Sequence, residues 1–387
     1  MATPPQARRN TNLDALRAIA ILMVLGHHAG QAIALLNASN VYTIYWNRVG
    51  WAGVDLFFVL SGFLISGLLF SSYQERGRID LSRFYIRRGL KIWPAFYTLI
   101  ATGVLLDAMT PGHHLSTSNL LSELLFVQDY FHSIWGITWS LAVEEHFYLA
   151  LPLVLLLMIR RDRGGPFAAM PYVFAGIAIF SLTCRFAVGW KENGTVDPWV
   201  CYFPTHLRMD GLMFGVLLCY YQRFRPSGFA RIVCWRGGWI IIAAAVVLLA
   251  TIPDENRNMH TWGYTVLYLG GGILVSKAVV FEGPRLIRVI SSLLARIGFY
   301  SYSIYLWHMF FVWRVLPHFH ISSPLGVFWS SIVGPILFGI GAAKVIEIPV
   351  LRFRDRAFPS IPGSRTASET TSIEELKEAP SGSVVAD

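Results

Sequence analysis

The chain alternates long apolar runs with short polar and basic connections. About ten of the runs are long enough to cross a bilayer as helices, and they are centred near residues 24, 60, 100, 148, 179, 213, 244, 271, 306 and 337. None shows the strict alternation of apolar and polar positions that marks a membrane-spanning strand. The pattern predicts an all-α fold, a polytopic membrane bundle of about ten transmembrane helices.

The composition agrees with this prediction, because 54% of the 387 residues are hydrophobic, only 14% are charged and the mean hydropathy is +0.50. These values exclude an ordinary soluble domain. Basic residues gather in every second connection, at 8–9, 76–91, 160–163, 223–236, 285–296 and 352–356. Since Lys and Arg favour cytoplasmic loops, we expect both termini in the cytoplasm. The net charge of +9 then reflects topology and predicts no nucleic-acid partner.

The sequence divides into three parts. Residues 1–11 form a cytoplasmic N-terminal segment, residues 12–357 the transmembrane domain, and residues 358–387 a cytoplasmic tail rich in Ser, Thr, Glu, Pro and Ala that is expected to be disordered. A cleaved signal peptide is the alternative for the N-terminus, but Asp14 and Arg17 fall inside the first apolar run and argue against it. We expect a multi-pass protein of a bacterial inner or plasma membrane, and the pattern predicts no particular oligomeric state.

The first apolar span carries one arginine and ends in two histidines, His27 and His28. On a helix, Arg17 and His28 lie on one face about 16 Å apart. An ionisable group at membrane depth is costly unless it meets a partner or water, so the default interpretation of His28 is functional. The alternative is a histidine that caps the helix or packs in the bundle.

A basic stretch follows the second span, with Arg83, Arg87 and Lys91 at four-residue spacing. On a helix these side chains form one cationic stripe at the cytoplasmic surface, which suits the phosphates of a ligand. The alternative role is membrane anchoring or contact with anionic lipids, which explains most such basic runs. Pro94 is expected to open the next span.

Other spans carry polar residues that predict a wet cavity inside the bundle. Glu144 and Tyr148 share a helix face, and Arg208 could pair with Asp210, Asp55 or Glu144. Small residues around Gly62 favour close helix packing. No metal is expected, because the four cysteines show neither CxxC nor zinc spacing. The residues expected at this cavity, besides Glu144, are Asp55, Ser61, Trp139, Tyr148, Arg208, Asp210, Tyr305 and His308.

Six segments taken in order resemble the motif series of acyltransferase family 3, the membrane O-acyltransferases, from about residue 12 to residue 350. By this resemblance the family's arginine and histidine fall on Arg17 and His28, while His27 takes a position that varies in the family. The carboxylate of its WSLxxE pattern falls on Glu144, and Arg208 and Asp210 match its RxD motif. The segments are LDALRAIAILMVLGHH, GVDLFFVLSGFLIS, RFYIRRGLKIWP, WSLAVEEHFYLALP, RMDGLMFG and IGFYSYSIYLWH.

The resemblance implies transfer of an acyl group, commonly acetyl, from cytoplasmic acyl-CoA to a hydroxyl of a sugar or another small acceptor. Acyl-CoA would be a co-substrate, with no tightly bound cofactor. We expect His28 to act as general base and Glu144 to orient its imidazole or to stabilise the imidazolium that forms. Arg17, Arg83, Arg87 and Lys91 are expected to hold the CoA phosphates. We expect a stand-alone form of the family, without the C-terminal extracytoplasmic hydrolase-like domain of its fused members.

Two other classes of protein fit the same intramembrane charges. A proton-coupled transporter or flippase would use His, Glu, Asp and Arg as a relay and would not consume acyl-CoA. A binding or sensory membrane protein would hold CoA without turnover. Release of CoA in the presence of a hydroxyl acceptor separates the enzyme from both.

Overall fold

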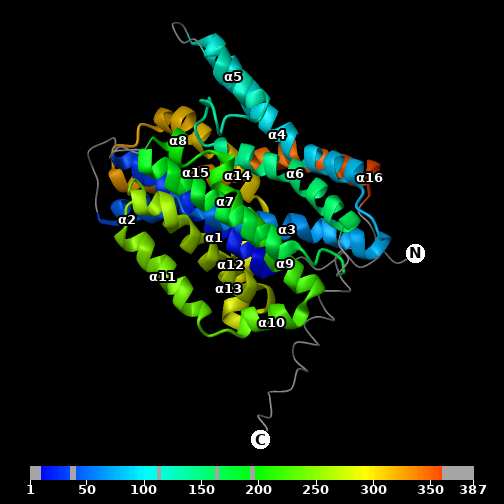
Figure 1. Cartoon of the computed structure of the whole chain (residues 1–387). Helices are drawn as coiled ribbons and strands as arrows, with labels where there is room; N and C mark the ends of the chain where they lie inside the picture. Colours follow the sequence, from blue (N-terminus) through cyan, green and yellow to red (C-terminus); the bar gives the residue numbers. More distant parts are fainter. Residues whose placement is uncertain (1–9, 35–40, 111–114, 162–164, 192–196, 360–387) are drawn as a thin grey trace, which may run out of the picture.

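The computed structural model describes residues 10–34, 41–110, 115–161, 165–191 and 197–359, and these ranges are helical with no strand among them. The expected all-α class is thus confirmed (Figure 1). The first half of the chain forms α1 (Thr11–Ala34), α2 (Val41–Gly50), α3 (Gly53–Arg76), α4 (Leu81–Met109), α5 (Thr117–Leu124), α6 (Trp139–Arg161), α7 (Met170–Lys191) and α8 (Pro198–Cys201).

The second half forms α9 (Thr205–Phe224), α10 (Pro226–Cys234), α11 (Gly238–Thr251), α12 (Tyr264–Val280), α13 (Arg285–Phe299), α14 (Ser301–Phe310), α15 (Pro324–Ala342) and α16 (Ile348–Ala357). Three short π-helical segments extend these elements, at Met259–Gly263, Phe311–Val315 and Ala343–Glu347, and a 3₁₀ turn covers Leu316–Phe319. Of the expected C-terminal tail, residues 360–387 lie outside the described ranges.

Seven helical regions in the described ranges are long and apolar enough to cross a membrane, and two bent helix pairs raise the number to nine. The bent pairs are α10 with α11, at 59°, and α13 with the helix that follows it, at 58°. The remaining predicted span, near residue 213, is α9, a helix of 20 residues that begins with several polar side chains. The count of ten and the cytoplasmic termini stay predictions.

Helix α9 lies inside the bundle against α3, α6, α7 and α12. A Cβ atom on Gly62 of α3 would overlap the carbonyl oxygen of Leu212, and one on Gly215 of α9 would overlap that of Val59. Glycine at both positions lets the two backbones touch, which is how helices associate closely in lipid. The packing interpretation of Gly62 is therefore confirmed, and α9 tolerates polar residues because its neighbours cover it.

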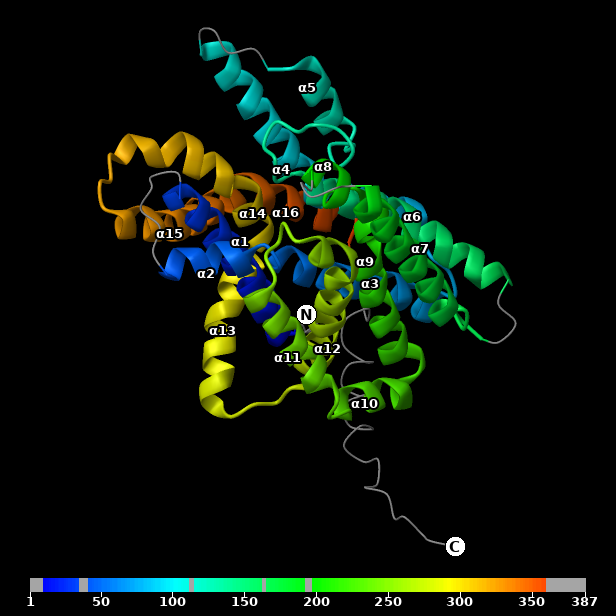
Figure 2. The ribbon, with the colours of Figure 1, turned by 60° about the vertical axis from the view of Figure 1, so that its left-hand side comes forward.

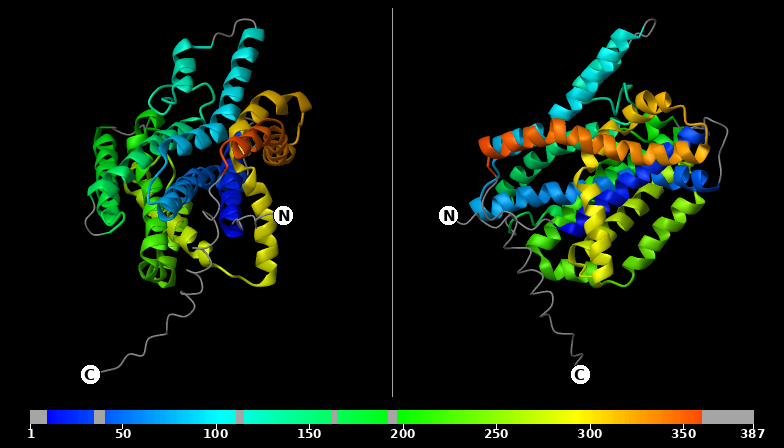
Figure 3. Two further views of the ribbon diagram at one scale, coloured as in Figure 1. Left: turned by 90° about the vertical axis from the view of Figure 1, so that its right-hand side faces the viewer. Right: turned by 180° about the vertical axis from the view of Figure 1, so that it is seen from behind.

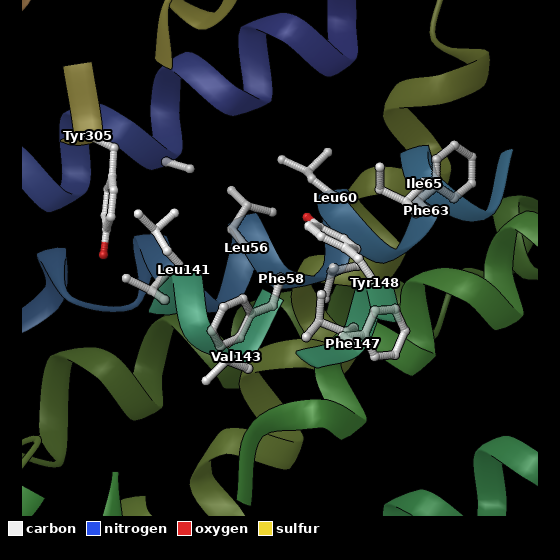
Figure 4. Close-up of a cluster of buried hydrophobic side chains, with 14 of the residues drawn as sticks. Leu56, Phe58, Leu60, Phe63, Ile65, Leu141, Val143, Phe147, Tyr148 and Tyr305 are labelled. Atoms are coloured by element: carbon white, nitrogen blue, oxygen red, sulfur yellow. The ribbon is translucent and has the colours of Figure 1, made fainter. Parts of the chain in front are cut away.

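The contact between α3 and α6 forms much of the core next to the site. Apolar side chains of the two helices interleave there, and nearly all of them are buried (Figure 4). Tyr148 and Tyr305 are the polar members of this cluster, and each hydroxyl finds a serine partner. The apolar members labelled in the figure are Leu56, Phe58, Leu60, Phe63 and Ile65 of α3 and Leu141, Val143 and Phe147 of α6.

Helix α4 differs from its predicted form. Pro94 lies inside one continuous helix and does not open a new one, because α4 starts at Leu81 with the Asp80 side chain accepting a hydrogen bond from the Arg83 N–H at 3.0 Å. The basic stretch and the following apolar run therefore share one helix. Its far end projects with α5 beyond the other helices (Figure 2). Near its start, α16 packs against it at the end of the long α15–α16 rod (Figure 3).

Candidate functional site

A cavity of about 710 Å³ opens between α1, α3, α4, α6, α14 and α16. The side chains that line it include eight arginines or lysines and five carboxylates, so the wall carries more positive than negative charge. Asn10 and Asp355, near the two ends of the described chain, both belong to this wall, which places these ends on the same side of the bundle. The basic residues are Arg17, Arg83, Arg87, Arg88, Lys91, Arg223, Arg352 and Arg354, and the acidic ones are Asp14, Asp80, Glu144, Glu347 and Asp355.

The cationic stripe predicted on α4 lies on the cavity wall together with Arg17 of α1. Arg88 joins it, although its position off the four-residue spacing gave no signal in the sequence. The guanidinium of Arg87 reaches α16, where it pairs with Asp355 at 3.0 Å and donates to the carbonyl of Phe358. Arg354 contacts the same carboxylate at 2.8 Å. Helix α16 thus contributes to the mouth of the cavity, a role that its sequence did not reveal.

Glu144 is held on the cavity side of α6. Tyr148 donates a hydrogen bond to its carboxylate at 2.7 Å, and Arg88 approaches it at 3.8 Å. The Arg88 guanidinium lies 3.9 Å from the centre of the Tyr148 ring, and Ser61 hydrogen-bonds the Tyr148 hydroxyl. Glu144 makes these contacts on the α4 side of the cavity, and none of the contacts found among the described residues joins it to His28, whose ring lies beside His308 of α14. Its expected role at this imidazole gains no support from these contacts and stays a prediction.

His28 lies six residues before the end of α1 and is half-buried. Its Nδ1 is 2.9 Å from Oε1 of Gln31, and the Gln31 amide nitrogen is 3.1 Å from Nε2 of His27. Nδ1 of His27 donates to the backbone carbonyl of Asn47 on α2 at 2.6 Å. His28 is not part of the cavity wall among the described residues.

His308 connects the surroundings of His28 to the cavity. Its ring is fully buried and lies 5.0 Å from the His28 ring, centre to centre. Its Nδ1 donates to the carbonyl of Tyr305 on the same helix. The Tyr305 hydroxyl donates to the carbonyl of Ile137 at 2.9 Å and accepts from Ser140 at 2.7 Å. Ser140 and Tyr305 both line the cavity, and the Tyr305 ring lies 5.5 Å from that of His308, so Tyr305 and His308 connect the cavity wall to His28.

Four residues expected at the cavity instead form a buried network outside it. Asp55 pairs with Arg208 at 2.8 Å, which selects one of the three partners expected for this arginine. Asp210 pairs at 2.8 Å with Arg185 of α7, which sequence reasoning missed although an arginine inside an apolar span is a signal. Trp139, Tyr202 and Tyr264 lie around the Arg208 guanidinium. Charge pairing between α3 and α9 turns Asp55 away from the cavity.

Glu123 supports the start of α6 from outside the apolar spans. Its Oε1 accepts from the Thr138 hydroxyl at 2.7 Å and from the Ile134 N–H at 3.0 Å. Burial raises the pKa of Glu123 to about 7. Through Thr138 this carboxyl orders the turn that presents Ser140 to the cavity.

Comparisons with known proteins find relatives that cover most of this chain. Residues 10–343 match the family described as an acyltransferase domain. The peptidoglycan O-acetyltransferase OatA of Listeria monocytogenes is 27% identical over 338 residues, which cover 81% of this chain and 51% of that protein. The O-acetyltransferase OatA of Staphylococcus aureus is 27% identical over 389 residues, which cover 92% and 59%. The chain thus spans little more than half the length of these relatives. No solved structure matches it.

Proposed function

Because this chain belongs to the acyltransferase family, we propose that it is a membrane O-acyltransferase. The donor would be a cytoplasmic acyl-CoA, and the acceptor a hydroxyl of a sugar or surface glycan. The acyl group is proposed to be acetyl, since similar proteins carry the name O-acetyltransferase and one of them is named for peptidoglycan.

The cationic cavity is the observation that supports the donor. A volume of about 710 Å³ lies within the range of about 300–1,000 Å³ of small-molecule sites. Arg17, Arg83, Arg87 and Lys91 would bind the phosphates, since guanidinium groups offer a planar fork of donors to phosphate oxygens. The apolar side chains of α3 would face the thin pantetheine arm of CoA, which carries the acyl group as a thioester.

His28 is proposed to be the general base. Its Nε2 would accept the proton of the acceptor hydroxyl while the hydroxyl oxygen attacks the thioester carbonyl. The carbon–sulfur bond then breaks, and the CoA thiolate takes up the proton to leave as the thiol. Glu144 would act on the donor side, where it holds Tyr148 and Arg88 in place.

The test of this function is release of free CoA by the purified protein from acetyl-CoA with soluble peptidoglycan fragments or monosaccharides. His28→Ala should lower the rate at least a hundredfold, because base catalysis typically supplies 10²–10⁴-fold. The matched control is His318→Ala, which removes an exposed imidazole. Residual activity of His28→Ala above about a tenth would exclude the base role, and no CoA release with any acceptor would favour a transporter.

Donor binding is tested separately with Arg17→Gln and Arg83→Gln. Each charge-assisted contact to a phosphate contributes about 1.5–3 kcal/mol, so each change should raise the Kd of acetyl-CoA roughly ten- to a hundredfold. Arg314→Gln, on the π-helical segment outside the cavity wall, is the control. Unchanged Kd values in both cavity variants would contradict the phosphate-binding role and favour membrane anchoring as the role of these arginines.

A further inference from the structure

The geometry points to a hydrogen-bond relay, from the Asn47 carbonyl through His27 and Gln31, that sets the tautomer of His28 and leaves its Nε2 free to accept a proton. This inference rests on the proposed function. It assigns His27 and Gln31 as positioning residues, which act through His28 and not on the substrate.

The direction of the relay is fixed at its outer end. A backbone carbonyl can only accept, so Nδ1 of His27 carries the proton that it donates to Asn47. Nε2 of neutral His27 is then an acceptor, and the Gln31 amide NH₂ donates to it. This orientation turns the Gln31 carbonyl oxygen toward Nδ1 of His28, which must donate. The proton of neutral His28 therefore sits on Nδ1, and Nε2 keeps its lone pair.

The local structure of α1 and α2 brings together the four groups of the relay, which are the Asn47 carbonyl and the side chains of His27, Gln31 and His28. Residues three and four apart on a helix are neighbours, so Gln31 reaches both His28 and His27 from one turn away. Helix α2 approaches closely at two glycines: a Cβ on Gly26 would overlap the Trp46 ring, and one on Gly50 would overlap the carbonyl of Met23. This contact brings the carbonyl of Asn47 against His27.

His308, the other imidazole beside His28, does not compete for this role. Its Nδ1 donates to the carbonyl of Tyr305, so the Nε2 of neutral His308 carries a lone pair, and that nitrogen is buried with no hydrogen-bond partner. It offers no proton to the free nitrogen of His28. The Gln31 oxygen is thus the group that selects the His28 tautomer among the described residues.

A general base needs its lone pair where the hydroxyl arrives. In the serine proteases, placing the catalytic histidine in the wrong tautomer lowers kcat about 10⁴-fold. A neutral amide holds a tautomer less firmly than a buried carboxylate does, since hydrogen bonds to charged groups are stronger. We expect loss of the Gln31 oxygen to lower kcat tenfold or more while the KM for acetyl-CoA is unchanged.

The experiment combines kinetics with nitrogen NMR of histidine-labelled protein in detergent. The His28 signals are those lost in His28→Ala, and they should show protonated Nδ1 and bare Nε2 at neutral pH. Gln31→Leu should shift this tautomer and lower kcat. Gln31→Glu should keep kcat within a few fold of the native value, because its carboxylate also accepts from Nδ1. Gln74→Leu, an exposed glutamine on α3, is the control.

The outcomes separate this inference from the proposed function. A His28 signal with the proton on Nε2 in the native protein would overturn the relay whatever the activity. Native kcat in Gln31→Leu would overturn it as well. Full activity of His28→Ala would instead overturn the base role, while the NMR signals would still report which nitrogen carries the proton.

Discussion

The buried pair of Asp55 and Arg208 gives a prediction about stability that separates it from the donor cavity. The side chains are 8% and 1% exposed and their charged atoms are 2.8 Å apart. Replacing Asp55 by Asn keeps the shape and leaves the guanidinium without its counter-charge. Asp210 cannot substitute for Asp55, because it is already paired with Arg185.

The expected loss follows from the burial of the charge that remains. Removing one partner of a buried ion pair typically costs about 3–5 kcal/mol, whereas replacing both partners is often close to neutral. Ring contacts at 3.9 Å from Tyr264 and 4.7 Å from Tyr202 still favour the cation, so we expect a loss of about 3 kcal/mol for Asp55→Asn. Arg208→Met should cost a similar amount, and the double variant about 1 kcal/mol.

The assay is reversible unfolding in detergent for the native protein, both single variants and the double variant. The four values should give a coupling energy of at least about 2 kcal/mol between the two positions. Asp355→Asn is the control, because its carboxylate is 54% exposed and should cost less than about 1 kcal/mol. Additive losses from Asp55 and Arg208 would refute the pairing argument, and a raised acetyl-CoA Kd in folded Asp55→Asn would place this pair in the donor site.

Two further predictions concern pH and topology. The pKa of Glu123 lies at about 7 in the folded protein against 4.5 ordinarily, so the folded state binds more protons between these values and its stability should fall by up to about 3 kcal/mol as pH rises through that window. Glu123→Gln should abolish the fall in unfolding free energy between pH 4.5 and 8, and an unchanged pH profile would contradict the shift. In a cysteine-free variant, a cysteine at Ser118 should react with an impermeant thiol reagent from outside the cell and one at Gln74 should not. The reverse pattern would invert the orientation.

Local sequence predicted the parts of the site that one helix carries. The α4 residues Arg83, Arg87 and Lys91 share one cavity wall, as their four-residue spacing indicated. Arg17 of α1, which was assigned to the same phosphates after the family resemblance was recognised, lies on that wall as well. Gln31 drew no prediction, although its three- and four-residue spacing to His28 and His27 makes these residues neighbours on a helix. Helical periodicity determines which residues share a face, but it does not determine which face meets the cavity.

Partners from distant segments could not be predicted in the same way. The Asp210–Arg185 pair, the Asn47 carbonyl and the approach of α16 to Arg87 each join separate elements. The sequence carries only weak signals for such contacts, because one buried charge does not reveal which of several opposite charges it meets. Glu144 illustrates the difficulty, since the face that it shares with Tyr148 was predicted but its approach to Arg88 of α4 was not.

The position of Tyr305 limits how donor and base can meet under the proposed function. Its hydroxyl is tied to Ser140 and Ile137 on the cavity side, while its carbonyl holds His308 against His28. A thioester that approaches Nε2 of His28 from this part of the cavity would pass Tyr305. Because the hydroxyl bonds can break by side-chain rotation while the carbonyl stays within α14, the passage can open without disturbing the histidines. The same helix would then separate the donor cavity from the base and keep the base in position during transfer.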